Sequence, residues 1–208
     1  MSDDPAHVFI VDDDESVRDA IGMLLDSVDV SYDAFPSADA FLGAYTSSMA
    51  GCLVLDIRMP GMSGLELQEK LHQLGSRIPI VFITGHGDIP MAVEAMRRGA
   101  VDFIRKPFRD QELLDRIHEA ISIDERTRSA AADVEHVKEL VAALTEREQE
   151  VFERVCNGQA NKVMAIEMGI SERTVEIHRS QVMHKTGARS LAELVRMKLK
   201  LEQLENEL

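Results

Sequence analysis

The chain has 208 residues, and its 23 Lys and Arg against 37 Asp and Glu give a formal net charge of −14. At roughly 150 residues per domain, this length allows one or two domains, each able to bury a core. The composition excludes a disordered chain, and no apolar run reaches the roughly 20 residues that cross a bilayer. The acidic N-terminus lacks the apolar core of a secretory signal, and the two cysteines are too few and too far apart for a disulfide framework. We therefore expect a cytoplasmic protein with no membrane partner.

The charge is divided unevenly along the chain. Residues 1–120 hold 10 Lys and Arg against 21 Asp and Glu, a net charge of −11, whereas residues 121–208 hold 13 against 16, a net charge of −3. Within the second part, the segment 159–200 has a net charge of +4. The overall charge argues against nucleic acid as a partner, but the local charge does not, so the two parts are interpreted separately.

Short apolar runs alternate with amphipathic stretches in the first part. The runs that predict strands are His7–Val11, Val30–Phe35, Cys52–Asp56, Ile78–Thr84 and Val101–Lys106. Continuous apolar strands separated by helices are typical of a parallel sheet covered on both faces. We predict a doubly wound α/β domain with five parallel strands, whose site lies at the carboxyl ends of the strands.

Polar side chains end four of these runs. They are Asp12, Asp13, Asp56, Thr84 and Lys106. The carboxyl ends of parallel strands converge, so three carboxylates, a hydroxyl and an ammonium are expected to share one pocket. Clustered carboxylates repel unless a cation lies among them, and oxygen ligands favour Mg²⁺, which Mn²⁺ could replace. Such a metal could bring a phosphoryl donor to one carboxylate, although a single strand-end Asp is more often a helix cap.

From Arg109 the pattern is helical and no further strand is expected. We interpret residues 109–143 as the last helix of the first domain running into a helical linker, with a break near residues 127–134. Thr145 and Glu148 form a capping-box pattern that opens a new helix. The predicted boundaries are therefore residues 1–122 for the α/β domain, 123–143 for the linker and 144–208 for a helical domain.

The helical domain contains a helix-turn-helix pattern. Gly169 can end one helix and Ser171 can cap the next, an arrangement that places a second helix in the major groove of DNA. The cations suited to phosphate contacts are Lys162, Arg173, Arg179 and Lys185. A plain structural hairpin is the alternative for the spacing alone, and the local positive charge favours the DNA-binding interpretation.

Four motifs in the first part resemble the receiver domain of two-component response regulators. They are Ile10–Asp13, Leu55–Gly64, Ile83–Asp88 and Phe103–Pro107, within a match over about residues 5–122. The resemblance implies that Asp56 is the phosphoacceptor. It also implies a Mg²⁺ site formed by Asp13, Asp56 and the backbone carbonyl of Arg58, with Asp12 acting through water.

The same resemblance implies a conformational switch. Thr84 and Phe103 would be the switch pair, Lys106 would contact the phosphoryl group, and the Lys106–Pro107 peptide bond would be cis. Arg58 and His86 flank the acceptor and would tune the lifetime of the phosphoryl group. A solvent-exposed His86 without a role is an equally good interpretation.

Residues 142–200 resemble the LuxR-type output domain, which together with the receiver gives the FixJ/NarL architecture. Within the receiver, the stretch Thr84–Met91 is more similar to FixJ than to NarL. The motifs of the output domain are Leu144–Val151, Asn161–Lys162 and Ser171–Arg179. The resemblance implies that Glu176, Ile177 and Ser180 face base edges and that Thr174 belongs to the DNA-binding set. Glu176 could accept a hydrogen bond from cytosine or could orient a neighbouring arginine.

Two surfaces are candidates for dimerisation. The first is the face formed by Ile89–Lys106, which would change on phosphorylation. The second is the final helix, where Leu194, Leu201 and Leu208 follow a heptad spacing. Packing of this stripe on its own domain is an equally good interpretation.

We predict a phosphorylation-dependent DNA-binding regulator of transcription, and family similarity favours an activator. Its expected partners are a sensor histidine kinase, double-stranded promoter DNA, RNA polymerase and, on phosphorylation, a second copy of the chain. One alternative is a phosphosignalling protein whose helical domain binds a protein. Another is a phosphohydrolase of the haloacid-dehalogenase type, but Arg58 stands where that class has its acid/base Asp, so we predict no enzyme.

Overall fold

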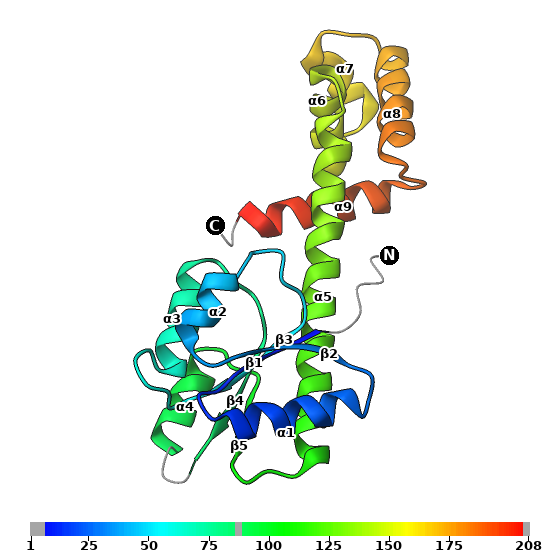
Figure 1. The fold of residues 1–208 in the computed structure, drawn as a ribbon. Coiled ribbons are helices and arrows are strands. Elements are labelled where there is room, and N and C mark those ends of the chain that lie inside the picture. Colours follow the sequence, from blue (N-terminus) through cyan, green and yellow to red (C-terminus); the bar gives the residue numbers. More distant parts are fainter. Residues whose placement is uncertain (1–6, 86–88, 206–208) are drawn as a thin grey trace. The chain divides into compact units, whose positions relative to one another are not determined.

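A computed structural model describes residues 7–85 and 89–205, without the side chains of Ile89 and of residues 203–205 (Figure 1). The chain divides into two compact units, Met1–Arg128 and Ser129–Leu208, and each is considered by itself. None of the helices in the described part is both long enough and apolar enough to cross a membrane.

The first unit is built on a five-stranded sheet in which all neighbouring strands are parallel. The strands are β1 (His7–Val11), β2 (Ser31–Phe35), β3 (Cys52–Asp56), β4 (Ile80–Thr84) and β5 (Asp102–Arg105). They lie in the order β2-β1-β3-β4-β5. This arrangement confirms the predicted doubly wound fold. Strand β4 begins after Pro79, because proline has no N–H to contribute to a central strand.

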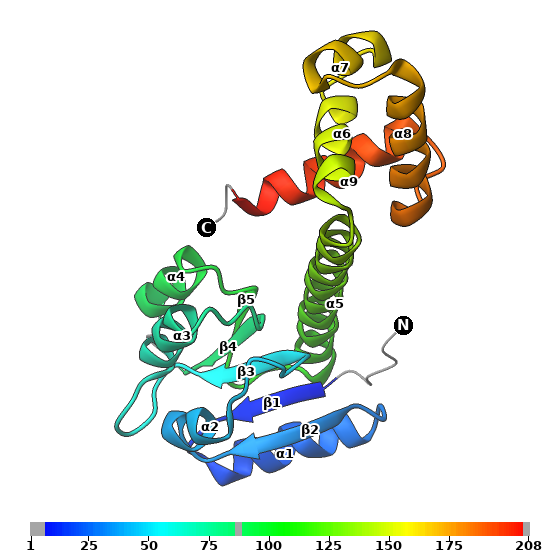
Figure 2. The ribbon, with the colours of Figure 1, turned by 90° about the horizontal axis from the view of Figure 1, so that it is seen from above.

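Helices cover both faces of this sheet (Figure 1 and Figure 2). The helices are α1 (Glu15–Asp26), α2 (Ala38–Ala44), α3 (Gly64–Gln73), α4 (Ile89–Arg97) and α5 (Asp110–Ala142). One apolar cluster joins α2, α3 and α4 to the sheet around Phe41 and Phe82, and a second joins α1 and α5 around Leu25 and Ile117. All residues of β3 and β4 are buried, as expected for central strands covered on both sides.

Helix α5 is continuous over 33 residues, and the boundary between the two units lies within it. The prediction of a break near residues 127–134 is therefore wrong. This segment contains neither Gly nor Pro, and its three consecutive alanines, Ala130–Ala132, have the highest intrinsic helix propensity. Its polar composition reflects solvent exposure and does not interrupt the backbone.

In its described residues, the second unit has four further helices around its own core. They are α6 (Glu146–Cys156), α7 (Asn161–Met168), α8 (Glu172–Thr186) and α9 (Leu191–Glu205). Thr145 and Glu148 form the predicted capping box of α6. Gly169 ends α7 with a positive φ of 67°, and the hydroxyl of Ser171 caps α8. The sequence-predicted helix-turn-helix is therefore present as α7 and α8.

Candidate functional site

The predicted acidic residues come together where β1 and β3 end. Asp12 and Asp13 follow β1, Asp56 ends β3, and β1 and β3 are hydrogen-bonded neighbours. One carboxylate oxygen from each of the three residues lies within 4.8 Å of the other two. Asp12 and Asp56 are buried, whereas Asp13 is exposed. The group is therefore open to solvent on the side of Asp13.

Lys106, just beyond β5, connects two of these carboxylates. Its Nζ lies 2.6 Å from Oδ2 of Asp12 and 3.2 Å from Oδ1 of Asp56. Burial opposes the charge of Lys106, but its hydrogen bond to Asp12 and the charge of Asp56 outweigh that effect and raise its pKa. The ammonium is therefore charged at neutral pH, where it offsets one of the three negative charges.

The pKa of Asp56 is raised to about 6, mainly because burial disfavours the carboxylate. Lys106 lowers this pKa and the neighbouring Asp12 raises it further. Three carboxylates and one ammonium leave the pocket with an excess of negative charge, and all of the carboxylate ligands are oxygens. This donor set fits a hard divalent cation such as Mg²⁺.

Two local contacts hold Asp12 in place. The backbone N–H of Asp14 donates to Oδ1 of Asp12 at 2.9 Å, and the guanidinium of Arg18 donates to the backbone oxygen of Asp12 at 2.8 Å. Asp14 itself caps α1 by accepting from Ser16. The sequence does not indicate this role of Arg18, because a cation in the first turns of an amphipathic helix is usually a solvated side chain.

Gly64 allows α3 to begin directly against the end of β3. A Cβ at this position would lie 2.2 Å from the backbone oxygen of Asp56, and the N–H of Gly64 donates to the backbone oxygen of Ile57 at 3.0 Å. Only glycine fits this close approach. Gly64 ends the Leu55–Gly64 motif, but the sequence does not reveal the contact that requires a glycine there.

The remaining residues of the predicted switch lie on neighbouring strands. Thr84 ends β4, is 2% exposed and donates to the backbone oxygen of Gly85. Phe103 pairs with Phe82 in the register of β4 and β5. Its side chain is half-buried and packs against the apolar cluster that joins α2, α3 and α4 to the sheet. The Lys106–Pro107 bond is cis, as expected. Arg58 is exposed, and His86 lies outside the described residues.

Helix α8 presents polar and apolar side chains to solvent. Arg173, Glu176, Ile177 and Ser180 are all exposed, and Ile177 is 55% exposed. The opposite side of the helix buries Val175 and Val182 in the domain core. A helix with one buried side and one exposed mixed side is suited to a groove of DNA.

Both units match families of known function. Residues 8–118 match the response regulator receiver domain, and residues 142–198 match the bacterial regulatory proteins of the luxR family. The chain is 46% identical over 202 residues to response regulator protein TodT of Pseudomonas putida, covering 97% of this chain and 89% of TodT.

Two solved structures are also similar over nearly the full length of the chain. The response regulator StyR matches with a TM-score of 0.86 and 46% identity, over 94% of this chain and 99% of StyR. Full-length FixJ from B. japonicum matches with a TM-score of 0.60 and 42% identity, over 95% and 98%. The chain belongs to the FixJ-like two-component response regulators. It is a phosphorylation-dependent, DNA-binding transcriptional regulator, in a family that is in general not enzymatic.

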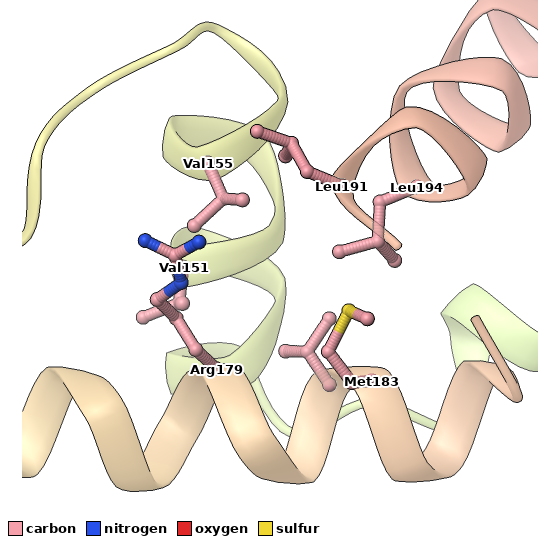
Figure 3. Close-up of a pocket in the computed structure, with 7 residues that line it drawn as sticks. Val151, Val155, Arg179, Met183, Leu191 and Leu194 are labelled. Atoms are coloured by element: carbon pink, nitrogen blue, oxygen red, sulfur yellow. The ribbon is translucent and has the colours of Figure 1, made fainter. Parts of the chain in front are cut away.

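In this response regulator, two of the four cations predicted to contact phosphates make contacts within the second unit. Lys185 pairs with Glu148 of α6 at 2.7 Å, and the Glu148 side chain is 7% exposed. Arg179 donates to Asn161 and borders a cavity of about 130 Å³ between α6, α8 and α9 (Figure 3). Lys162 and Arg173 are exposed. Thr174 is half-buried and hydrogen-bonds to the cap residue Ser171.

The two predicted dimerisation surfaces of the response regulator differ in their exposure. Leu194 is 2% exposed and packs in the core of its own domain, so at this position the stripe follows the second of its two interpretations, packing on its own domain. Leu201 is half-buried, and Leu208 lies outside the described residues. On α4, by contrast, Val93 is 48% exposed and Met96 is 38% exposed. The Ile89–Lys106 face therefore carries exposed apolar side chains.

Proposed function

We propose that Asp56 is the residue that accepts the phosphoryl group. The observation that carries this proposal is the position of Lys106, whose Nζ lies within 3.2 Å of Asp56 and closer still to Asp12. With a pKa of about 6, Asp56 is mostly ionised at neutral pH, and its carboxylate oxygen can attack phosphorus. The phosphohistidine of a sensor kinase loses its N–P bond as the new O–P bond forms, and the histidine is released unmodified.

We assign roles to the residues around Asp56 by their similarity to the receiver family. Asp13, Asp56 and the backbone carbonyl of Arg58 would bind Mg²⁺, with Asp12 acting through water; Mn²⁺ is the alternative ion. When bound, the cation neutralises charge on the phosphoryl oxygens. Lys106 donates hydrogen bonds to those oxygens at the end of the reaction, when Asp56 no longer carries its own charge.

We propose that the phosphoryl group is then sensed by Thr84 and Phe103. The Thr84 hydroxyl turns from the backbone oxygen of Gly85 toward a phosphoryl oxygen, and the volume it leaves allows the Phe103 ring to move inward. Phe103 has no hydroxyl, so its movement depends on packing alone. Arg58 and His86 are the candidates for control of phosphoryl lifetime.

The proposed domains have the predicted boundaries. Residues 1–122 are the receiver, residues 123–143 are the linker, and residues 144–208 are the DNA-binding domain. Two phosphorylated copies associate through the Ile89–Lys106 face, where Val93 and Met96 are exposed. Their α8 helices read neighbouring half-sites of promoter DNA in the cytoplasm, and RNA polymerase responds. Arg58 stands where phosphohydrolases of the haloacid-dehalogenase type have their acid/base Asp, and this difference supports the absence of phosphatase turnover.

The test of this function uses Asp56→Asn in the full-length chain. Wild-type protein incubated with Mg²⁺ and acetyl phosphate should gain one phosphoryl group, and the variant should gain none. Phosphorylation should also raise the affinity for duplex DNA selected from random sequence. If Asp56→Asn still becomes phosphorylated, the acceptor assignment is wrong; if duplex binding does not respond to phosphorylation, the coupling is wrong.

A further inference from the structure

The exposed side of α8 extends further along the helix than the residues already assigned to DNA. Arg173, Ile177, Ser180 and His184 are exposed and follow one another at spacings of four, three and four residues. This spacing places them in one row on the helix. The row lies opposite the buried side chains of α8, which are Val175, Val182 and Thr186.

His184 and its neighbour Lys185 face different surroundings. The ammonium of Lys185 pairs with the buried Glu148 of α6, so this cation stabilises the domain. His184, by contrast, is exposed, and in the described part of the chain its imidazole makes no hydrogen bond or ion pair. Of these two residues at the end of α8, only His184 faces the same side as Ile177 and Ser180.

The length of this row decides what its ends can contact. Arg173 and His184 are separated by about 16 Å along the helix axis, at 1.5 Å per residue. The major groove of B-DNA is about 12 Å wide. When the helix axis crosses the groove at an angle and Ile177 and Ser180, in the middle of the row, face base edges, the row is long enough for its two ends to reach the phosphates on either side of the groove.

We propose that His184 contacts a backbone phosphate through an imidazole N–H, on the groove wall opposite to Arg173. This inference rests on the proposed role of α8 in DNA binding. It replaces Lys185 with His184 as the phosphate contact at the end of α8. Because phosphates carry no sequence information, His184 contributes to affinity and to the orientation of α8, but not to the choice of bases.

The experiment measures duplex affinity of the phosphorylated full-length chain on a selected site and on an unrelated duplex. His184→Ala should weaken binding about tenfold on both duplexes, as expected for one hydrogen bond to a charged group. His184→Lys should retain the affinity. His136→Ala, which removes an exposed imidazole from α5, is the matched control and should bind like wild type. Thermal unfolding of each variant checks that the fold is unchanged.

Three outcomes would overturn the proposal. An affinity of His184→Ala within twofold of wild type on both duplexes would exclude the contact. A loss confined to the selected site would make His184 a base-reading residue. If the wild-type chain bound no duplex at all, the proposed function would fail together with this inference, whereas the first two outcomes would leave that function standing.

Discussion

Replacing Asp56 with Asn should stabilise the receiver at neutral pH in the absence of divalent metal, although it removes the proposed phosphoacceptor. Burial raises the pKa of Asp56 from 3.8 to about 6, since Lys106 offsets only part of the effect of burial and of Asp12. The folded receiver therefore binds a proton at Asp56 more tightly than the unfolded chain does. Ionisation of this carboxyl opposes folding.

The sign and size of the effect follow from the shift. A carboxyl whose pKa is raised on folding contributes most below its unfolded pKa of 3.8, and the contribution is lost as the pH rises through about 6. Two pKa units correspond to roughly 3 kcal/mol, and access of solvent from the side of Asp13 reduces this to about 1–2 kcal/mol. Asn does not ionise, so the variant avoids this loss.

The assay is native-state hydrogen exchange of β3 and β4 in the full-length chain with a metal chelator, at several pH values between 4 and 8. The variant should exceed wild type in free energy of unfolding by about 1–2 kcal/mol at pH 8, and the difference should disappear near pH 4. Asp19→Asn, an exposed carboxylate on α1, is the control. Added Mg²⁺ should stabilise wild type more than the variant. Equal stability at pH 8, or a difference independent of pH, would refute the reasoning.

Three further predictions concern local contacts. Gly64→Ala should destabilise the receiver by roughly 1–3 kcal/mol in chemical denaturation and slow phosphorylation, because the new Cβ would lie 2.2 Å from the backbone oxygen of Asp56. Ser171→Ala should cost about 1 kcal/mol in the second unit, measured by hydrogen exchange of α8, since it removes the cap. Lys185 and the Thr145 N–H lower the pKa of Glu148 to about 2. The stabilisation of the second unit by the ionised Glu148 side chain is therefore complete above pH 4.5 and is lost as the pH falls toward 2. Thermal unfolding of Glu148→Gln should lack that acid dependence.

The fold and the receiver pocket could be predicted because their signals are local in sequence. Each strand is a continuous apolar run, and each polar residue of the pocket stands at the end of such a run. Parallel topology then brings those ends to one edge without further information. The helix caps at Thr145 and Gly169 were predictable for the same reason, since a cap depends on residues within one turn.

The sequence could not predict environments that depend on partners far apart in the chain. Lys185 and Glu148 are 37 positions apart, and nothing local indicates that they pair. Leu194 fits a heptad spacing, but a stripe on a final helix can cover its own domain or a second subunit, and periodicity does not distinguish the two. The expected break in α5 is wrong for a different reason. A polar stretch predicts a loop, but here the stretch is rich in alanine, which sustains the helix.

The net charge of +4 on the segment 159–200 overstates the number of cations available to DNA, because several of these cations are paired within the protein. Three of its lysines pair with carboxylates outside the segment: Lys185, Lys198 and Lys200. In the described part of the chain, the cations of this segment without a side-chain hydrogen bond or ion pair are Lys162, Arg173 and Arg189. Each phosphate contact contributes about 0.9 to the slope of log affinity against log salt, so a single subunit with so few free cations binds DNA weakly. Association of two subunits doubles the number of contacts on one duplex. The scarcity of free cations on one subunit therefore gives a physical reason for the proposed dependence of DNA binding on dimerisation after phosphorylation.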